Sequence, residues 1–302
     1  MPTTHPVLAT HLELATGFGK DLLRKWRQRY GFPQPIATGS GKVAYSRQTV
    51  DQLLVIKHLL DCGFRPAKIV GKTPLELARL NQTTAGQCPA TAPNESIRRL
   101  IERVRQSDLT GLQTLLATAR ARGTLTDFVV NTVAPLLTEL GAAWSRQEIE
   151  IFHEHFCTVI IQRCLHAEVQ ACKKKPGHPR ILFATPPEEN HVMGRLMAEA
   201  VLADQGAHIA CTGTHLPIND MALAAAAFRA DVLALSFSIA YPRRRIRPTL
   251  LQVRRLLPAR IQLWVGGAGA AIIMRPPKGM RIFSDFQESV TALHDLARQK
   301  RG

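Results

Sequence analysis

The sequence predicts a multidomain fold that combines helical regions with a C-terminal α/β domain. Three observations predict it: 302 residues are more than one hydrophobic core usually organises, 45% of them are hydrophobic, and the apolar periodicity changes twice along the chain. The first region shows short helices around a hairpin, the second shows helices alone, and the third alternates strands with helices. We therefore expect a small helix-and-hairpin module, a central four-helix bundle and a doubly wound parallel sheet.

The N-terminal module is expected over residues 1–80. Its apolar spacing and its glycines predict helices at 12–16, 20–29 and 48–62 and a hairpin at 33–46. Ser46 or Thr49 can cap the last of these helices, and Gly63 can end it. A polar stretch that is rich in threonine, proline and glycine follows at 81–93 and predicts a linker.

The central region, residues 94–175, shows four helical patterns and almost no strand signal. The patterns run roughly over 95–106, 109–121, 126–142 and 147–172. Asn94, Asp108 and Thr126 are of the residue types that cap helix N-termini. Four consecutive helices with short connections predict an up-and-down bundle.

The C-terminal region, residues 176–302, changes to an alternation of strands and helices. Apolar runs at 181–185, 209–212, 232–237, 261–265 and 281–283 alternate with helical patterns near 193–205, 218–229, 247–257 and 287–300. Five such units with short loops predict a flavodoxin-like or Rossmann-like doubly wound sheet. A ligand is then expected at the carboxyl ends of the strands.

Positive charge is concentrated at the two ends of the chain. The formal net charge is +16, of which residues 1–80 carry +7, residues 81–172 carry −1 and residues 173–302 carry +10. Such an excess favours a polyanionic partner, although basic residues can also serve only to solubilise a surface. The run from Arg243 to Arg247 can contact DNA, a cofactor phosphate or a neighbouring subunit, or form a solvated loop. If it contacts DNA, binding should depend more steeply on salt than binding by residues 1–80 alone.

Apolar runs in the sequence are too short to span a bilayer, and the N-terminus lacks the basic and apolar regions of a signal peptide. The six cysteines include no CxxC pair, which favours reduced thiols over a disulfide framework or a zinc site. These features predict a cytoplasmic protein without a membrane partner.

The segment 22–31 concentrates cations on a predicted helix. Its apolar members are expected to pack on one face: Leu22, Leu23 and Trp26. Its polar members spread over the remaining surface: Arg24, Lys25, Arg27 and Gln28. Arginine and glutamine suit paired hydrogen bonds with base edges, and Lys42 and Arg47, near the hairpin, can bind backbone phosphates. A basic helix that is merely solvated is the alternative.

The stretch ATGFGKDLLRKWRQRYGFPQP, the segment GSGKVAYS and a helix that ends in LLDCGF occur in this order. Together they resemble the recognition helix, wing and connector of the MerR family of winged-helix regulators, over residues about 10–72. The resemblance implies a winged helix-turn-helix that binds double-stranded DNA. The polar members of the helix above, with Lys42, Tyr45 and Arg47, would lie at the interface. Many members have arginine where this chain has Lys42, and a lysine there still reaches a phosphate.

A loop after the first strand of the sheet region carries a carboxylate, an imidazole and a glycine. In the sequence PPEENHVMG, these residues are Glu189, His191 and Gly194. His191 offers a ring nitrogen to a metal, Glu189 can accept the other ring N–H and hold the tautomer, and Gly194 leaves room for a bulky group. For this spacing alone, a histidine without a ligand in an ordinary loop is the alternative.

Two later strand ends carry small residues. Ser236 and Ser238 lie at the end of the third strand, and Gly266 and Gly267 lie at the end of the fourth. With the E-x-H-x-x-G loop, they resemble the cobalamin-binding domain of methionine synthase and its relatives. All three elements fall at the carboxyl ends of predicted strands, where the fold places its ligand.

This resemblance assigns a role to each residue. It implies that His191 is the lower cobalt ligand, that Glu189 holds it from behind, and that Ser236 hydrogen-bonds the displaced nucleotide tail. The two glycines would let the tail pass close to the backbone. Relatives usually have leucine at position 238, so Ser238 is expected to alter the packing of the tail and to leave the ligand unaltered.

Trp144, Glu154 and His155 are candidates for the other face of the cofactor. Trp144 closes the third predicted helix, and the Glu–His pair lies on the fourth. An indole gives a flat apolar cover for a corrin ring or an adenosyl group, and the pair can hydrogen-bond a ribose or an adenine edge. The alternative is a buried tryptophan beside a helix with an exposed Glu–His pair.

The spacing W-x9-EH ahead of a cobalamin domain resembles the light-sensing, adenosylcobalamin-dependent repressors of carotenoid genes, the CarH/LitR-type group. This resemblance covers nearly the whole chain. It implies a repressor that binds its operator in the dark as a homo-oligomer, a tetramer, and that is released when light breaks the cobalt–carbon bond. In some members a histidine after the tryptophan takes the vacated cobalt position, whereas this chain has Ser145. His153, His155 or water are the alternatives there.

Two other functions remain open. One is a MerR-type regulator that senses cobalamin chemically, or binds none, and does not respond to light. The other is an enzyme subunit, such as a corrinoid methyl carrier or a mutase subunit. The enzyme is disfavoured because the chain has no room for the substrate barrel of such enzymes and because they have no use for a DNA-reading module.

Overall fold

The computed structural model describes residues 7–8, 12, 16, 18, 20–37, 43–61, 66–85, 94–146, 148–172, 179–238, 241–270, 273, 276 and 278–300. The chain divides into two compact units, Met1–Ala92 and Pro93–Gly302. Within the described residues, no helix has both the length and the apolar character that a membrane crossing requires.

The N-terminal unit contains a small antiparallel sheet and several helices. The strands are β1 (Val7–Leu8), β2 (Ile36–Ala37) and β3 (Val43–Tyr45), in the order β1-β3-β2. The helices are α2 (Lys20–Tyr30), α3 (Arg47–Asp61), α4 (Pro66–Ile69) and α5 (Pro74–Ala85). Pairing of β2 with β3 confirms the predicted hairpin, while β1 is too short to show a strand pattern in the sequence. Helix α5 continues to Ala85, into the segment 81–93 whose composition predicts a linker.

Helix α2 packs with only part of its predicted apolar face. Leu23 and Trp26 are buried, and the Trp26 ring lies edge-on to Phe18 with ring centroids 4.9 Å apart. Leu22 is 40% exposed, so the predicted three-residue face is wrong at this position. Neighbouring residues lie about 100° apart around a helix, and the core here accommodates the Leu23 side of that arc. At the next helix, Ser46 is the cap, because its hydroxyl accepts a first-turn N–H at 3.1 Å.

The second unit begins with the helical bundle. Its elements are α6 (Glu95–Arg105), α7 (Leu109–Arg120), α8 (Leu125–Phe128), the π-helical turn η1 (Val129–Val133), α9 (Ala134–Ser145) and α10 (Ile151–Ala171). The third predicted helix is therefore a continuous run of α8, η1 and α9. Apolar side chains from the whole bundle share one core, among them Leu100, Leu116, Leu136 and Leu165.

Short polar side chains fix the helix starts of the bundle. Asn94 and Asp108 cap α6 and α7 as predicted, accepting backbone N–H groups at 2.9 and 2.8 Å. The prediction of Thr126 as a cap is wrong, because the cap of α8 is Thr124, which forms a capping box with Asp127. Both threonines give the same local signal, and the reciprocal bonds of the capping box favour the earlier one.

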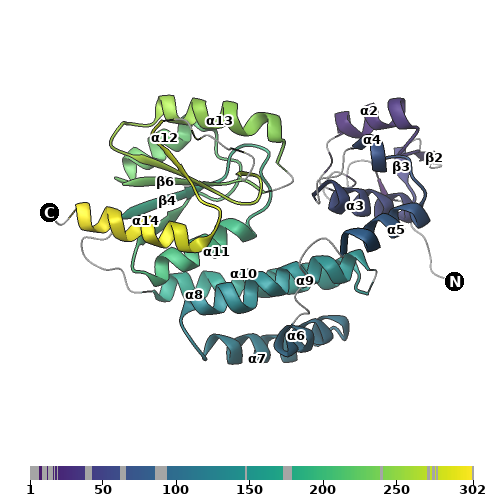
Figure 1. Ribbon diagram of the computed structural model, residues 1–302, viewed down its shortest axis with the longest axis horizontal. Helices are drawn as coiled ribbons and strands as arrows, with labels where there is room; N and C mark the ends of the chain where they lie inside the picture. The colour runs from purple at the N-terminus through teal and green to yellow at the C-terminus, as the bar shows by residue number, and fades with distance from the viewer. Residues whose placement is uncertain are drawn as a thin grey trace. The chain divides into compact units, whose positions relative to one another are not determined.

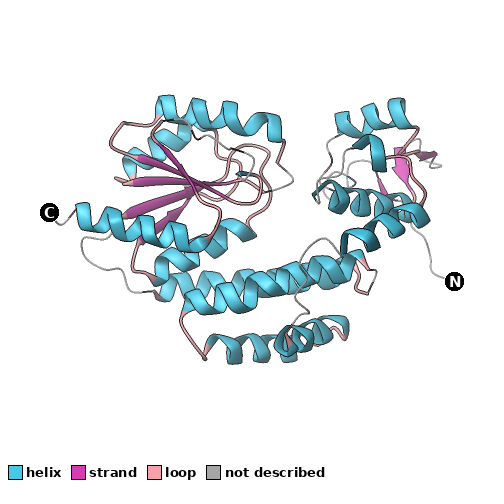
Figure 2. Ribbon diagram, in the orientation of Figure 1, coloured by secondary structure: helices cyan, strands magenta, loops and turns pink. Residues whose placement is uncertain are grey.

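The rest of the second unit is a five-stranded parallel sheet with helices on both faces (Figures 1 and 2). The strands are β4 (Arg180–Ala184), β5 (His208–Cys211), β6 (Val232–Ser236), β7 (Gln262–Gly266) and β8 (Met280–Ile282). The helices are α11 (Met193–Asp204), α12 (Ile218–Ala227), α13 (Arg243–Leu256) and α14 (Phe286–Gln299). The order β5-β4-β6-β7-β8 confirms the predicted doubly wound sheet, of the flavodoxin-like type. Such sheets bind ligands where the order reverses, which here is between β4 and β6.

Alternate strand residues pack on opposite faces of the sheet. Ile181 and Phe183 share a core with the helical bundle, α11 and α14, whereas Leu182 and Ala184 share a second core with α12 and α13. Because both faces are covered, the strands read as continuous apolar runs in the sequence. The first core joins the bundle to the sheet, so the two pack against each other directly.

A polar contact also joins the bundle to the sheet region. Asp204, the last residue of α11, accepts a hydrogen bond from the backbone N–H of Thr126 at 3.0 Å and another from its hydroxyl at 2.6 Å. The N–H belongs to the first turn of α8 and has no partner within its own helix. Asp204, at the C-terminal end of α11, therefore supplies a hydrogen-bond acceptor for the N-terminal turn of α8.

Asp204→Ala is expected to lower the free energy of unfolding by about 1–3 kcal/mol, because it removes the acceptor of two hydrogen bonds. Asp295→Ala is the matched control, since Asp295 pairs with Arg298 on an exposed face of α14 and such pairs contribute about 0–1 kcal/mol. Chemical denaturation of the full chain, followed by circular dichroism, measures both changes. An equal decrease in the free energy of unfolding in the two variants would show that the Asp204 contact does not stabilise the packing of the bundle against the sheet region.

Candidate functional site

His191 lies in the loop between β4 and α11, at the carboxyl edge of the sheet, beside a buried carboxylate. Its Nδ1 atom is 3.0 Å from Oε1 of Glu189, and the same oxygen accepts the backbone N–H of His191 at 2.8 Å. The Glu189 side chain is 1% exposed, whereas that of His191 is 46% exposed. The imidazole is thus held from behind by a buried anion while nearly half of its surface stays open.

Glu189 accepts two further hydrogen bonds, both from Ser238, which lies two residues after the end of β6. The backbone N–H of Ser238 donates to Oε2 at 2.7 Å, and the Ser238 hydroxyl donates to Oε1 at 3.0 Å. Burial alone would raise the pKa of Glu189, but the hydrogen bonds from His191 and Ser238 outweigh burial and hold that pKa below its ordinary value. An ionised Glu189 favours the tautomer with the proton on Nδ1 of His191. This tautomer leaves the Nε2 lone pair for a metal.

Ser238 lies closer to His191 than the family pattern implies. Its hydroxyl oxygen is 3.1 Å from Nδ1 of His191, in addition to its bonds to Glu189. The expectation that Ser238 leaves the ligand unaltered is therefore wrong, because this hydroxyl shares the carboxylate with the histidine. The sequence alone does not reveal the contact, which arises because β4 and β6 are neighbours in the sheet.

Ser236, Gly194 and Gly266 lie together beside the end of β6. Ser236 and Gly266 are register partners in β6 and β7, and Ser236 is buried. A Cβ atom at Gly194 would be in van der Waals contact with the Ser236 hydroxyl at 3.6 Å, and one at Gly266 would meet nothing within 4 Å. Gly266 therefore leaves open space beside Ser236, whereas a side chain at position 194 would pack against the Ser236 hydroxyl.

Gly267 is required to be glycine for a different structural reason. Its φ is +89°, and a Cβ atom there would lie 2.3 Å from the carbonyl oxygen of Phe237. Gly269, which sequence reasoning missed, is constrained in the same way by the carbonyl oxygen of Ser238 at 2.3 Å. At both positions the backbone that follows β7 lies against the backbone that follows β6, so only glycine fits.

Trp144, Glu154 and His155 lie on the bundle, on either side of the turn between α9 and α10. Trp144 is half-buried and packs against the core that the bundle shares with the sheet. Nδ1 of His155 is 2.7 Å from Oε2 of Glu154, and the Thr158 hydroxyl donates to Oε1 of Glu154 at 2.9 Å. The predicted Glu–His pair is thus a connected hydrogen-bonding group on an exposed helix face. Among the hydrogen bonds of the described residues, none joins it to His191.

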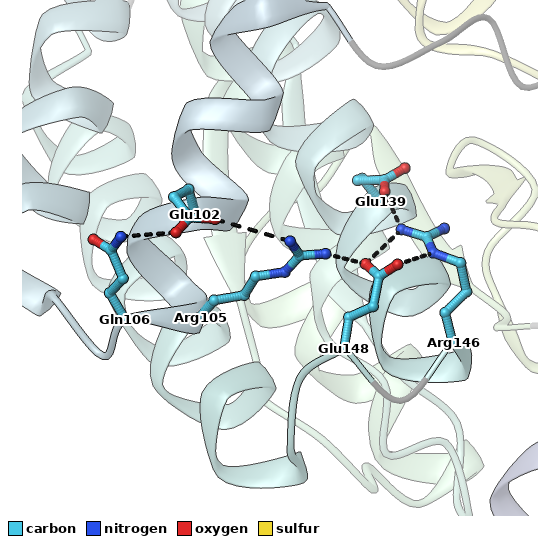
Figure 3. A network of polar contacts seen from close by, with 6 residues as sticks. All are labelled: Glu102, Arg105, Gln106, Glu139, Arg146 and Glu148. Carbon is cyan, nitrogen blue, oxygen red and sulfur yellow. Dashed lines mark hydrogen bonds and ion pairs between the residues drawn. The ribbon is translucent and has the colours of Figure 1, made fainter.

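An ionic network fixes the turn between α9 and α10 (Figure 3). Arg146 donates to Glu139 on α9 at 2.6 Å and to Glu148 in the turn at 2.7 Å, and Glu148 also pairs with Arg105 on α6. The hydrogen bond from Arg146 lowers the pKa of Glu148, and the same bond raises the pKa of Arg146. Sequence patterns do not reveal this network because its members come from separate helices. It ties the turn, and hence the spacing of the residues on either side, to α6.

The polar face of α2 is exposed, as predicted, in the N-terminal unit. Its exposed or half-exposed members are Arg24, Lys25, Arg27 and Gln28. Tyr45 departs from the prediction, because it is 7% exposed on β3, opposite Val7, and belongs to the core of the unit. A buried ring cannot serve as a surface contact for DNA. Lys42 lies outside the described residues, and Arg47 is the first residue of α3.

The arginine run after β6 is helical rather than a loop. Arg243, Arg244 and Arg247 are exposed in the first turns of α13, which contain no acidic residue. Arg245 forms an ion pair with Glu188, in the loop that carries His191. Arg245 therefore attaches α13 to the loop that carries His191, and the other three arginines face solvent.

Two family models match the chain. The model described as MerR HTH family regulatory protein matches residues 9–73, which include α2, α3 and α4. The model described as B12 binding domain matches residues 96–167, which include most of the helical bundle. The bundle thus carries the B12 match, immediately ahead of the sheet that holds His191.

The chain is also similar to two repressors of Myxococcus xanthus. It is 28% identical over 267 residues to the HTH-type transcriptional repressor CarH, covering 85% of this chain and 87% of that protein. It is 27% identical over 260 residues to the HTH-type transcriptional repressor CarA, covering 84% of each. Among solved structures, it aligns with the Methanosarcina barkeri monomethylamine corrinoid protein at 14% identity and a TM-score of 0.49, covering 68% of this chain and all of the other.

Proposed function

We propose that this chain, which joins a MerR-type helix-turn-helix to a B12-binding domain, is a cobalamin-dependent transcriptional repressor and not an enzyme. The observation that carries the proposal is the group of His191, Glu189 and Ser238 at the point where the strand order reverses. The likeness to two repressors along more than four fifths of the chain supports the regulatory role. The exposed cations of α2 support a double-stranded DNA operator as the partner.

The residues at the sheet edge fit cobalamin. Nε2 of His191 would hold the cobalt, with Glu189 and Ser238 fixing the ring through Nδ1. The open space at Gly266 can admit a nucleotide tail, and Ser236 lies beside it with a hydroxyl for a hydrogen bond. We assign Gly267 a role in the fold first, because its Cβ position is filled by a neighbouring carbonyl.

Adenosylcobalamin is the form we propose, because it would supply a cobalt–carbon bond that visible light can break. Trp144 would cover the adenosyl group, and Glu154 and His155 would hydrogen-bond its ribose or adenine. Trp144 packs against the core shared by bundle and sheet, so loss of a group beneath it would change how the two fit together. We propose that this change controls assembly into a homo-oligomer, a tetramer. In the dark, the N-terminal DNA-binding domains of several chains would then bind DNA together. Binding to an operator would place the protein in the cytoplasm, at the nucleoid.

A regulator that senses cobalamin without light is the second candidate. It is favoured by Ser145, which stands where some light-sensing relatives carry a histidine for the vacated cobalt position. The two candidates share the cobalamin site and the DNA-binding helix. They differ only in whether illumination changes DNA binding.

A direct test loads the purified full chain with adenosylcobalamin in darkness, removes free cofactor, and measures visible absorbance and DNA affinity. The DNA is a duplex selected by the loaded protein from a random pool. We expect retained cobalamin in about a 1:1 ratio and tighter DNA binding with the cofactor than without it. Absence of retained cobalamin, or equal DNA affinity with and without it, would contradict the proposal.

Gln28→Ala and Lys25→Ala are expected to weaken DNA binding in different ways. Gln28 can read a base edge, so its loss should cost about 1–3 kcal/mol on the selected duplex and relax the preference at one position. Lys25 can bind a phosphate, so its loss should weaken binding to all sequences and reduce the salt slope by about 1. Fluorescence anisotropy over a range of salt concentrations measures both. Identical changes in the two variants would contradict this assignment of roles.

A further inference from the structure

His215 joins the loop that carries His191 to the neighbouring loop of the sheet edge. It lies between β5 and α12, and its imidazole reaches two residues that flank Glu189. The backbone N–H of Glu188 donates to its Nδ1 at 3.2 Å, and its Nε2 is 2.6 Å from Oδ1 of Asn190. One ring therefore binds the loop immediately before and immediately after Glu189.

The hydrogen bonds fix the tautomer of His215. A backbone N–H only donates, so Nδ1 must carry no proton in this arrangement, and the ring proton lies on Nε2. Nε2–H then donates to the Asn190 side-chain oxygen. The neutral ring is fully used as one acceptor and one donor, and both of its bonds go to the His191 loop.

Both ends of this link have backbone in the left-handed region. Glu188 has φ of 72° and His215 has φ of 59°, and neither is a glycine. Such conformations are unfavourable for residues other than glycine and persist where surrounding contacts hold them. Here the contact that joins the two strained residues is the His215 ring itself.

A second neighbour holds the other side of the loop. Arg245, in the first turn of α13, forms an ion pair with the Glu188 carboxylate. The loop after β5 and the first turn of α13 therefore both bind Glu188, the loop at its backbone N–H and the helix at its carboxylate. The ion pair is half-exposed on both sides, and such pairs contribute little to stability.

We propose that His215 is a positioning residue for the cobalt site, which holds residues 188–190 so that Glu189 and His191 keep their mutual geometry. The inference rests on the proposed cobalamin function and adds a residue to it. Without the link, the loop would relax from its strained backbone, and Glu189 would no longer hold the His191 ring in one orientation. His215 touches neither His191 nor the space beside Ser236 in any described contact, so its effect would pass through the loop.

Three substitutions at position 215 separate the bond from the backbone strain. His215→Ala removes the ring and keeps the strain, whereas His215→Gly removes the ring and relieves the strain. His215→Asn keeps a side-chain acceptor for the Glu188 N–H and belongs to the residue type that best tolerates positive φ. His294→Ala, on an exposed position of α14, is the matched control.

The experiment titrates the full chain with hydroxocobalamin and with adenosylcobalamin in darkness and records visible spectra and dissociation constants. Loss of a side chain that is hydrogen-bonded to a metal ligand weakens metal binding by about 10–100-fold. Because His215 acts on the ligand only through the loop that carries Glu189, we expect a loss of affinity at the lower end, on the order of 10-fold, for His215→Ala and His215→Gly. We also expect both variants to show a mixture of histidine-bound and water-bound cobalt spectra. His215→Asn should recover most of the affinity and the histidine-bound spectrum, and His294→Ala should match the unaltered chain.

The outcomes distinguish this inference from the proposed function. If the unaltered chain binds no cobalamin, the proposed function fails, and this inference fails with it. If the unaltered chain binds and His215→Gly matches it in affinity and spectrum, the cobalamin site stands and the role of His215 is overturned. If His215→Ala proves unstable by thermal melting, the comparison of the glycine and asparagine variants decides in the same way.

Discussion

His191→Ala is expected to weaken cobalamin binding by more than about 10-fold and to change the visible spectrum of any cofactor that still binds. The imidazole is 46% exposed, and its Nδ1 is engaged by Glu189 and Ser238, which leaves Nε2 for cobalt. Loss of a side chain that is hydrogen-bonded to a metal ligand costs about 10–100-fold in affinity, and this substitution removes the proposed ligand itself. Titration of the full chain in darkness, followed by absorbance, measures the effect.

Glu189→Gln is expected to weaken cobalamin binding less than His191→Ala does. It keeps an oxygen acceptor beside Nδ1 but removes the negative charge of a carboxyl whose pKa is lowered by its hydrogen bonds, whereas His191→Ala removes the proposed ligand itself. His294→Ala controls for the loss of a histidine elsewhere. Equal spectra and affinities for His191→Ala and His294→Ala would contradict the ligand assignment. Unaltered DNA regulation in His191→Ala would instead favour a regulator that does not use cobalt.

Glu199→Ala is expected to lower the free energy of unfolding by about 3–5 kcal/mol, because it leaves a buried arginine without its counter-ion. Arg195 and Glu199 form an ion pair one turn apart on α11, with side chains only 5% and 4% exposed. Arg195 also donates to Sγ of Cys211 on β5, and its Nε has no hydrogen-bond partner among the described residues. Glu95→Ala is the matched control, since Glu95 makes the same type of pair with Arg99 on an exposed face of α6.

The reverse substitution, Arg195→Met, should cost less and should depend on pH. Burial raises the pKa of Glu199, and Arg195 opposes that rise, so removal of Arg195 should raise the pKa further. A carboxyl whose folded-state pKa exceeds its unfolded value binds more protons in the folded state, so stability increases as pH falls through the folded pKa towards the unfolded value. Glu199→Ala should show no such recovery, because an arginine stays protonated throughout this range. Parallel pH profiles for the two variants, measured by chemical denaturation, would contradict this account of the pair.

The strong periodic patterns of the sequence predict the order of the regions, the bundle and the sheet correctly. The apolar runs give every strand of the parallel sheet because both sheet faces are buried, and the switch from helix period to strand period marks where the sheet begins. The strand order then brings the loops after β4 and β6 together, so Glu189, His191 and Ser236 fall at one edge as predicted. These features depend on local pattern and on a general rule of topology.

The sequence fails where a residue's role depends on contacts between distant segments. Ser238 differs from the family pattern by one residue, and only the pairing of β4 with β6 shows that its hydroxyl meets Glu189. The ion network of Arg146 and the link through His215 likewise join separate elements. Tyr45 lies in a segment whose resemblance predicts a surface wing, yet its ring fills the small core of the unit. Local spacing carries no signal for any of these contacts.

A comparison of DNA binding before and after green light decides whether light controls this protein. The full chain, loaded with adenosylcobalamin in darkness, is mixed with its selected duplex, and fluorescence anisotropy and molecular mass are recorded before and after illumination. We predict that the dark complex is oligomeric and bound, and that light lowers both the mass and the DNA affinity while the cofactor spectrum changes. A change in the spectrum with unaltered mass and unaltered DNA binding would contradict the claim that cobalamin photochemistry controls this repressor.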